Sequence, residues 1–362
     1  MDSFELAHSI RYSDDIKLRT INHSSERIKF YETDLALNSI KISREITPKI
    51  YESLQSACNS LKLDLDRVRA YVTSSPEIQA SCVSFNKNAC ILTLTSKIIN
   101  LLNSEEIKFV IGHELGHFLL SHNIEEQLEH KSKESFLKKR SQEISVDRIG
   151  LWACGDINIA IRAIIKSLSG LSEDFIVFDV KSLLKQLNTD VSRKQISEQF
   201  STHPSFILRL KALLRFSECD AFQKHTKNVA GKDLKRIDKN IREEFDIYID
   251  KELRENILNL KNNLSFWGHA YAFVSDGSIS LESQKLMKKK FDEKRVGKLM
   301  NMIANLEKEL VLETLEDKFI SSINNFKKSA PNSAKKEMNL IFEDIGNYSS
   351  QNDFLNKVLK KI

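Results

Sequence analysis

The segment His113-Glu114-Leu115-Gly116-His117 limits the fold of this 362-residue chain more than any other stretch. In a helix, residues four positions apart lie on one face, so both imidazoles can bind a single Zn²⁺ ion. Glu114 then lies beside the metal, where its carboxylate can accept a proton from a zinc-activated water that attacks a carbonyl. The pattern predicts a metal-binding helix with the groups needed to hydrolyse a peptide bond.

The residues around this segment favour a helix that faces a cleft. Asn103 or Ser104 can cap the start of the helix, and Glu105 and Glu106 suit its positive end. Gly116 costs about 1 kcal/mol relative to alanine inside a helix, which is consistent with another backbone or a ligand approaching closely. Apolar residues form one stripe, and the two histidines point away from it: Ile107, Ile111, Leu115, Phe118 and Leu119.

A third metal ligand is expected further along the chain. Leu120 and Asn123 occupy the positions where the metzincin pattern has Gly and His, so that class is excluded. His122 follows the second histidine by five residues and falls off the ligand face, which makes it a poor ligand. Glu143 is the better candidate: Glu143 and Asp147 are four apart on a predicted helix, so one carboxylate can bind zinc while the other orients a histidine. A solvated acidic face is the alternative, but neighbouring apolar residues indicate partial burial: Ile144, Ile149, Leu151 and Trp152.

Further motifs follow in a fixed order around the helix. They are the two strand-like stretches within 76–96 with a turn at Asn86-Lys87-Asn88, the segment Glu143–Gly150, the stretch from Cys154-Gly155-Asp156 to Leu168, and Thr202-His203-Pro204-Ser205 with Arg209. Together, over about residues 46 to 216, they resemble the zinc metallopeptidases that include the HtpX-type and CAAX prenyl proteases. These are gluzincins, in which two histidines and a downstream glutamate hold the zinc. The chain departs from the family at Gln79, where Asn is usual.

The resemblance implies a role for each motif. His113, His117 and Glu143 would bind one Zn²⁺ per chain, with Glu114 as general base and Asp147 orienting a ligand histidine. An extended substrate would pair with an edge strand at Gln79, Ala80 and Ser81, which gives affinity with little sequence demand; an ordinary hairpin is the alternative. His203 would either stabilise the oxyanion or bind zinc as a fourth ligand that keeps the enzyme latent. As a lone histidine it would instead be a capping or surface residue.

Composition indicates a mostly helical protein without a nucleic-acid partner. The chain has only 4 prolines and 10 glycines, and its 55 basic residues are nearly balanced by 50 acidic ones, for a net charge of +5. No apolar run of about 18 residues is present, so we expect a soluble, cytoplasmic protein without membrane insertion. The five cysteines contain no C-x-x-C pair and are expected to be reduced thiols.

The fold class predicted from these patterns is mainly α with a small β-sheet (α+β). We expect an N-terminal arm over residues 1–45, a gluzincin metallopeptidase domain over 46–218 and a helical C-terminal domain over 219–362. Within the last of these, Phe273–Glu282 faintly resembles the helix-turn-helix of TerB-like modules. The amphipathic stripe that ends at Ile362 is interpreted as core packing, with a protein-binding face as the alternative.

These observations favour a zinc metalloendopeptidase that acts on polypeptides. Two other classes remain open from the sequence. One is a catalytically latent zinc-binding module with a protein-interaction or chaperone-like role, although a purely structural zinc site needs no base such as Glu114. The other is a helical scaffold in which the His113–His117 pattern is coincidental, and it predicts a protein that binds no metal.

Overall fold

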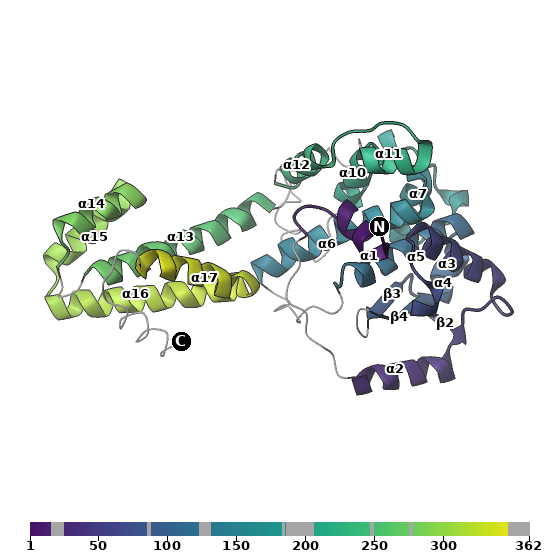
Figure 1. The fold of residues 1–362 in the computed structure, drawn as a ribbon, viewed down its shortest axis with the longest axis horizontal. Coiled ribbons are helices and arrows are strands. Elements are labelled where there is room, and N and C mark those ends of the chain that lie inside the picture. Colours follow the sequence, from purple (N-terminus) through teal and green to yellow (C-terminus); the bar gives the residue numbers. More distant parts are fainter. Residues whose placement is uncertain are drawn as a thin grey trace. The chain divides into compact units, whose positions relative to one another are not determined.

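The computed structural model describes residues 1–15, 25–84, 88–122, 132–182, 185, 206–246, 250–274 and 278–346. The chain forms two compact units, shown in Figure 1. Unit 1 comprises Met1–Gln127 and Phe136–Asp250, and unit 2 comprises Leu128–Ser135 and Lys251–Ile362. Helices predominate and one small mixed sheet accompanies them, which confirms the predicted α+β class.

Unit 1 contains the sheet, whose described strands run in the order β1-β2-β4-β3. The strands are β1 (Ile40–Lys41), β2 (Val68–Thr73), β3 (Ala80–Ser84) and β4 (Cys90–Thr95). β3 and β4 pair antiparallel, as predicted for the stretch 76–96, whereas β2 and β4 pair parallel. Every residue of β4 is buried: β4 has a strand on each side, and α4 and α5 pack against it. β3 is the edge strand, so one side of its backbone is open to another chain. Of the predicted turn, Asn86 and Lys87 lie outside the described residues.

The described part of unit 1 also contains helices. They are α1 (Ser3–Ile10), α2 (Ser25–Asn38), α3 (Pro48–Ser60), α4 (Ser96–Leu101), α5 (Ser104–Leu119), α6 (Lys133–Cys154, which starts in the unit 2 segment), α7 (Ile157–Ser169), α10 (Phe206–Ser217), α11 (Asp220–Lys227) and α12 (Leu234–Phe245), with short 3₁₀ turns at Leu65–Arg67 and Glu173–Phe175. α5 packs against β3, β4, α3 and α7. Asn103, one of the two predicted caps, is the residue that caps this helix, and it forms a capping box with Glu106.

Glycines allow α5 and α6 to cross at very short range. A Cβ atom on Gly112 of α5 would lie 2.5 Å from the Cβ atom of Ala153 and 3.0 Å from the Cα atom of Gly150 on α6. A Cβ atom on Gly116 of α5 would lie 3.1 Å from the Val146 side chain of α6. The absence of these side chains brings the two backbones together, so that polar side chains from both helices reach one place.

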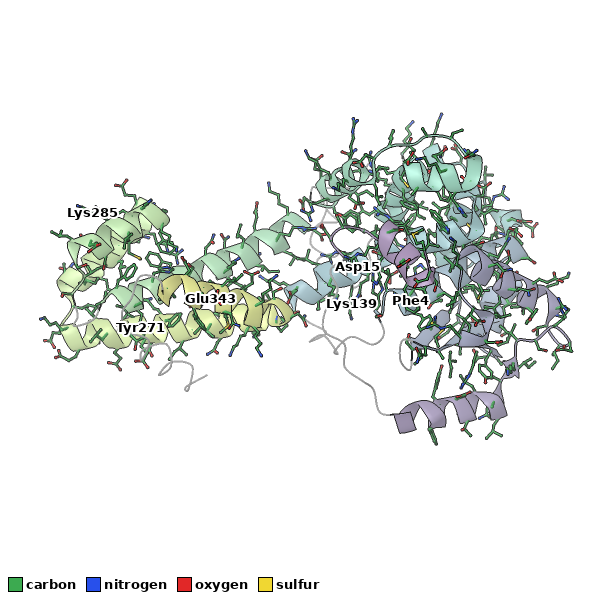
Figure 2. The ribbon with its side chains drawn as sticks, in the orientation of Figure 1. Phe4, Asp15, Lys139, Tyr271, Lys285 and Glu343 are labelled. Atoms are coloured by element: carbon green, nitrogen blue, oxygen red, sulfur yellow. The ribbon has the colours of Figure 1, made fainter. Side chains whose placement is uncertain are left out.

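Unit 2 is helical in its described part. Its helices are α13 (Lys251–Phe273), α14 (Leu281–Lys290), α15 (Glu293–Asn305), α16 (Lys308–Ser329) and α17 (Pro331–Gly346). α13 and α16 pack along each other and share two apolar clusters, one with α17 and one with α14 and α15. Tyr271 of α13, labelled in Figure 2, donates a hydrogen bond of 2.9 Å to Glu316 of α16. Ser280 caps the start of α14, and its side chain accepts a hydrogen bond from the backbone N–H of Ser283.

The compact units and the predicted domain ranges divide the chain at different places. α11 and α12 contribute Phe222, Ile237, Ile241 and Phe245 to the apolar core of unit 1, so that unit extends to Asp250 rather than to residue 218. α1 contributes to the same core through Leu6, Ala7 and Ile10. The ranges 1–45, 46–218 and 219–362 therefore stay predictions about domains. None of the described helices is long and apolar enough to cross a membrane.

Candidate metal centre

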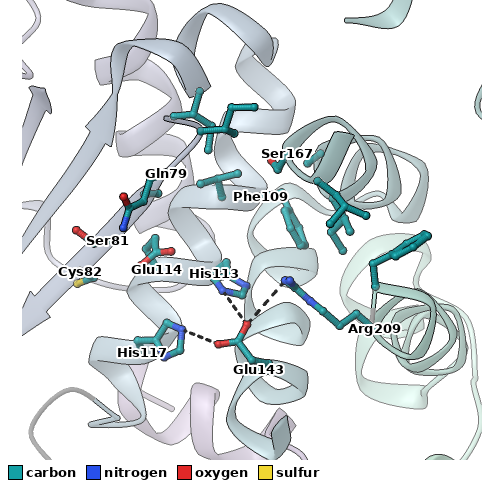
Figure 3. Close-up of a pocket in the computed structure, with 18 of the residues that line it drawn as sticks. Gln79, Ser81, Cys82, Phe109, His113, Glu114, His117, Glu143, Ser167 and Arg209 are labelled. Carbon is teal, nitrogen blue, oxygen red and sulfur yellow. Dashed lines mark ion pairs between the residues drawn. The ribbon is translucent and has the colours of Figure 1, made fainter. Parts of the chain in front are cut away.

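α5 and α6 bring three of the predicted site residues into one cluster, shown in Figure 3. The Nε2 atom of His113 lies 3.6 Å from Oε2 of Glu143, and the Nε2 atom of His117 lies 3.6 Å from Oε1 of the same carboxylate. One ligand atom from each of the three residues lies within 4.8 Å of the others. Bonds of about 2.0–2.1 Å in a tetrahedral zinc site place ligand atoms about 3.4 Å apart. The cluster therefore has the spacing and the donor types that suit a zinc-sized ion.

Asp147 contacts the side of the His113 ring that faces away from Glu143. The Nδ1 atom of His113 donates a hydrogen bond of 2.9 Å to Oδ1 of Asp147, because an ionised carboxylate can only accept. The Nε2 atom of His113 is then the lone-pair atom, and it faces Glu143. Arg209 of α10 donates two further hydrogen bonds to Asp147, at 2.8 and 2.6 Å. Burial alone would raise the pKa of Asp147, but Arg209 and His113 together lower it to about 2.

Glu114 lies in the same cleft, between the cluster of candidate ligands and the edge strand β3. Its carboxylate accepts a hydrogen bond from the backbone N–H of Cys82 in β3. Burial raises the pKa of Glu114 above its ordinary value, although the neighbouring His113 opposes that rise. A carboxylate with a raised pKa next to a candidate metal site is suited to proton transfer near neutral pH.

The cleft around these groups has a volume of about 640 Å³. Its polar end holds the histidines, Glu143 and Arg209, and β3 forms one wall. Apolar residues of α4, α5 and α7 also line the cleft: Ile98, Phe109, Val110, Ala163, Ile164 and Leu168. A cleft with an apolar lining and a few convergent polar groups is the usual form of a binding site for an organic ligand.

The three residues that we predicted to bind substrate, Gln79, Ala80 and Ser81, all line this cleft. The register of β3 and β4 separates their backbones. The N–H of Thr95 donates to the carbonyl of Gln79 at 3.0 Å, so Gln79 and Ser81 direct their backbone groups toward β4. Alternation then directs the backbone groups of Ala80 and Cys82 toward the open side of β3, and the hydrogen bond from Cys82 to Glu114 agrees with this.

The sequence did not indicate the contacts that three residues make near the centre. These residues are Arg209, Asp15 and His122. Arg209 entered only as part of a motif, and Asp15 did not enter at all. His122 was placed off the ligand face, yet its Nδ1 atom lies 3.0 Å from Nδ1 of His117, because the helix ends before it. His203 lies outside the described residues, so its role stays a prediction.

Comparison with known proteins gives one family. Residues 45–138 match the model of peptidase family M48. This range contains His113, Glu114 and His117 and ends before Glu143, which the structure places beside both histidines. No curated protein and no solved structure matched the chain in these comparisons. The match over residues 45–138 supports peptidase family M48 and a metallopeptidase function.

Proposed function

We propose that this protein is a zinc-dependent endopeptidase in which His113, His117 and Glu143 hold one zinc ion per chain. The observation that carries this proposal is the convergence of the three ligand atoms within 4.8 Å, beside a second carboxylate, that of Glu114, in an open cleft. Zinc bound there would polarise the substrate carbonyl and lower the pKa of a water molecule toward neutrality. The donor set of two imidazoles and one carboxylate is that of a catalytic rather than a closed structural zinc site.

In this proposal Glu114 is the general base. It accepts the proton of the attacking water and returns a proton to the amine that leaves when the peptide bond breaks. Its raised pKa, caused by burial, makes both transfers easier near neutral pH. The hydrogen bond from Cys82 fixes the carboxylate in the cleft before substrate arrives. Asp147 keeps the Nε2 atom of His113 directed at the metal.

The substrate would be a polypeptide in extended conformation that pairs with the open side of β3. Ala80 offers its N–H and carbonyl, and Cys82 offers its carbonyl, at the correct alternation for one further strand. Because this pairing uses only backbone groups, it accepts many sequences. In line with the resemblance, His203 is proposed to act on the oxyanion or as a regulatory ligand.

The test compares Glu114→Gln with the wild type on an unfolded protein substrate. Glu105→Gln is the control, since Glu105 lies in the same helix with its side chain half exposed. General-base catalysis typically contributes about 10²- to 10⁴-fold, so we expect a loss of that size for Glu114→Gln and none for the control. Mass spectrometry of the purified protein should find about one zinc per chain, absent from Glu143→Ala. Equal cleavage by Glu114→Gln and wild type would refute the mechanism.

A further inference from the structure

His117, the second histidine of the proposed zinc site, also has a hydrogen-bond partner at its Nδ1 atom, and that partner is another histidine. The Nδ1 atoms of His117 and His122 lie 3.0 Å apart, and Nε2 of His122 lies 3.0 Å from Oδ2 of Asp15. Since the Asp15 carboxylate only accepts, Nε2 of His122 donates to it; in a neutral His122 ring Nδ1 then has no proton and accepts from Nδ1 of His117. The lone-pair atom of His117 is then Nε2, which faces Glu143.

The C-terminal end of α5 puts His122 in this position. Ser121 has a φ of 62°, in the left-handed region that ends helices, and the N–H of His122 donates to the carbonyl of His117 at 2.9 Å. A left-handed conformation costs a residue other than glycine roughly 1 kcal/mol. The chain thus reverses over His117 at some cost in stability, and the reversal presents the His122 ring to the metal ligand.

Asp15 belongs to a segment, Tyr12–Asp15, that is fixed to two helices of unit 1. The N–H of Tyr12 donates to Oγ of Ser145 at 3.0 Å, and the N–H of Ser13 donates to Asp238 of α12 at 3.1 Å. Arg148 of α6 donates to the carbonyl of Arg11 and to Asp238, and so ties the segment to both helices.

The side chains of Asp15 and His122 are almost fully buried, with 5% and 3% of their surface exposed. Burial alone would raise the pKa of Asp15, but His122, Ser145 and Lys138 together lower it, so the carboxylate stays ionised. A buried carboxylate that faces a histidine ring keeps that ring in one tautomer and one orientation.

We propose that Asp15 and His122 form a relay that positions His117 for the metal, and that Asp15 is thereby part of the metal centre. The relay rests on the proposed zinc site. Each ligand histidine then has a carboxylate behind it: Asp147 directly for His113, and Asp15 through His122 for His117. Outer partners of this kind fix the orientation of the ligand and raise its basicity, and their loss typically weakens metal binding about 10- to 100-fold.

The test measures the affinity of the full-length protein for Zn²⁺ by competition with a chromophoric chelator. His122→Phe keeps an aromatic ring without nitrogen atoms and should weaken binding about 10- to 100-fold. Asp15→Asn changes little volume and should weaken it less, because the amide oxygen still accepts; it also serves if His122→Phe fails to fold. The double variant should bind as His122→Phe does, because Asp15 acts only through His122. The visible absorption of bound Co²⁺ should shift in both single variants.

Asp14→Asn is the matched control. Asp14 is the neighbour of Asp15, and its carboxylate pairs with the half-exposed Arg242. We expect its Zn²⁺ affinity and Co²⁺ spectrum to equal those of the wild type. The relay would be refuted if His122→Phe and Asp15→Asn bound Zn²⁺ as tightly as the wild type, or if Asp14→Asn weakened binding as much as Asp15→Asn. A wild type that binds no Zn²⁺ would refute the metal centre itself, which is a separate result.

Discussion

Arg209 grips Asp147 with two hydrogen bonds, at 2.8 and 2.6 Å, and the Asp147 side chain is only 1% exposed. Removal of the guanidinium would leave a buried carboxylate with a single strong donor, His113. We therefore expect Arg209→Met to lower the free energy of unfolding by about 3–5 kcal/mol, measured in urea without metal. Arg209→Lys should restore only part of this, because an ammonium cannot make the two-pronged contact.

Arg215 provides the comparison for that experiment. It lies on the same helix, α10, and pairs with Glu244 with 37% of its side chain exposed. Exposed pairs of this kind typically contribute less than about 1 kcal/mol, so Arg215→Met should change the unfolding free energy little. Similar losses for Arg209→Met and Arg215→Met would contradict the structural importance of the contact with Asp147.

The lowered pKa of Asp147 predicts how stability changes with pH. In the unfolded chain an aspartate titrates near 3.9, whereas in the folded protein the pKa of Asp147 is about 2. A depressed folded pKa stabilises the protein above about pH 4, and this contribution falls as the pH drops toward 2. Its size is on the order of 2 kcal/mol. Urea unfolding of metal-free wild type and Asp147→Asn between pH 2 and 6 should give curves that converge at low pH. Curves that stay parallel would argue against this assignment.

Two glycine-to-alanine changes, one at the close crossing of α5 and α6 and one away from it, should have opposite effects on stability. A Cβ atom on Gly150 would lie 2.8 Å from the carbonyl oxygen of Phe109, so Gly150→Ala must push the helices apart. We expect it to destabilise unit 1 by about 1–3 kcal/mol and to weaken metal binding. Gly297 of α15 has open space around it, and Gly297→Ala should stabilise its helix by up to about 1 kcal/mol. Thermal unfolding measures both, and a neutral Gly150→Ala would count against the crossing.

The left-handed conformation of Ser121 gives a fourth prediction. Glycine adopts a φ of 62° without steric cost, so Ser121→Gly should raise the unfolding free energy by up to about 1 kcal/mol and leave Zn²⁺ affinity intact. Ser121→Val should lower both quantities, because a β-branched residue resists this conformation. Chemical unfolding and chelator competition on the two variants provide the measurement. If valine were tolerated as well as glycine, the turn would not hold His122 in place.

The sequence predicts those parts of the centre that depend on local spacing. The helix around His113 follows from its cap and apolar stripe, and the pairing of Glu143 with Asp147 follows from a separation of four residues. The contact of His122 with His117 does not follow from the sequence, because helical periodicity applies only as far as Leu120, after which Ser121 reverses the chain. A left-handed serine has no signature comparable to that of glycine at the same position.

Sequence patterns do not predict contacts between residues that lie far apart in the sequence. Arg209 follows Asp147 by 62 residues, and Asp15 precedes His122 by 107. The sequence did not indicate β2 either, because its parallel pairing with β4 depends on the fold between them. Charged residues such as Asp15 are common on protein surfaces, so their type alone does not distinguish a buried partner from a solvated one.

The contact of α5 with α6 at Gly112 and Gly150 also bears on the state of the protein without the proposed zinc ion. The three proposed ligand side chains come from two helices whose backbones meet, so they are preorganised when unit 1 folds. The entropy lost in gathering them belongs to folding, and little further ordering accompanies metal entry. Chelation should therefore leave an intact apoprotein that can be reloaded, in contrast to small zinc domains that unfold when the ion leaves.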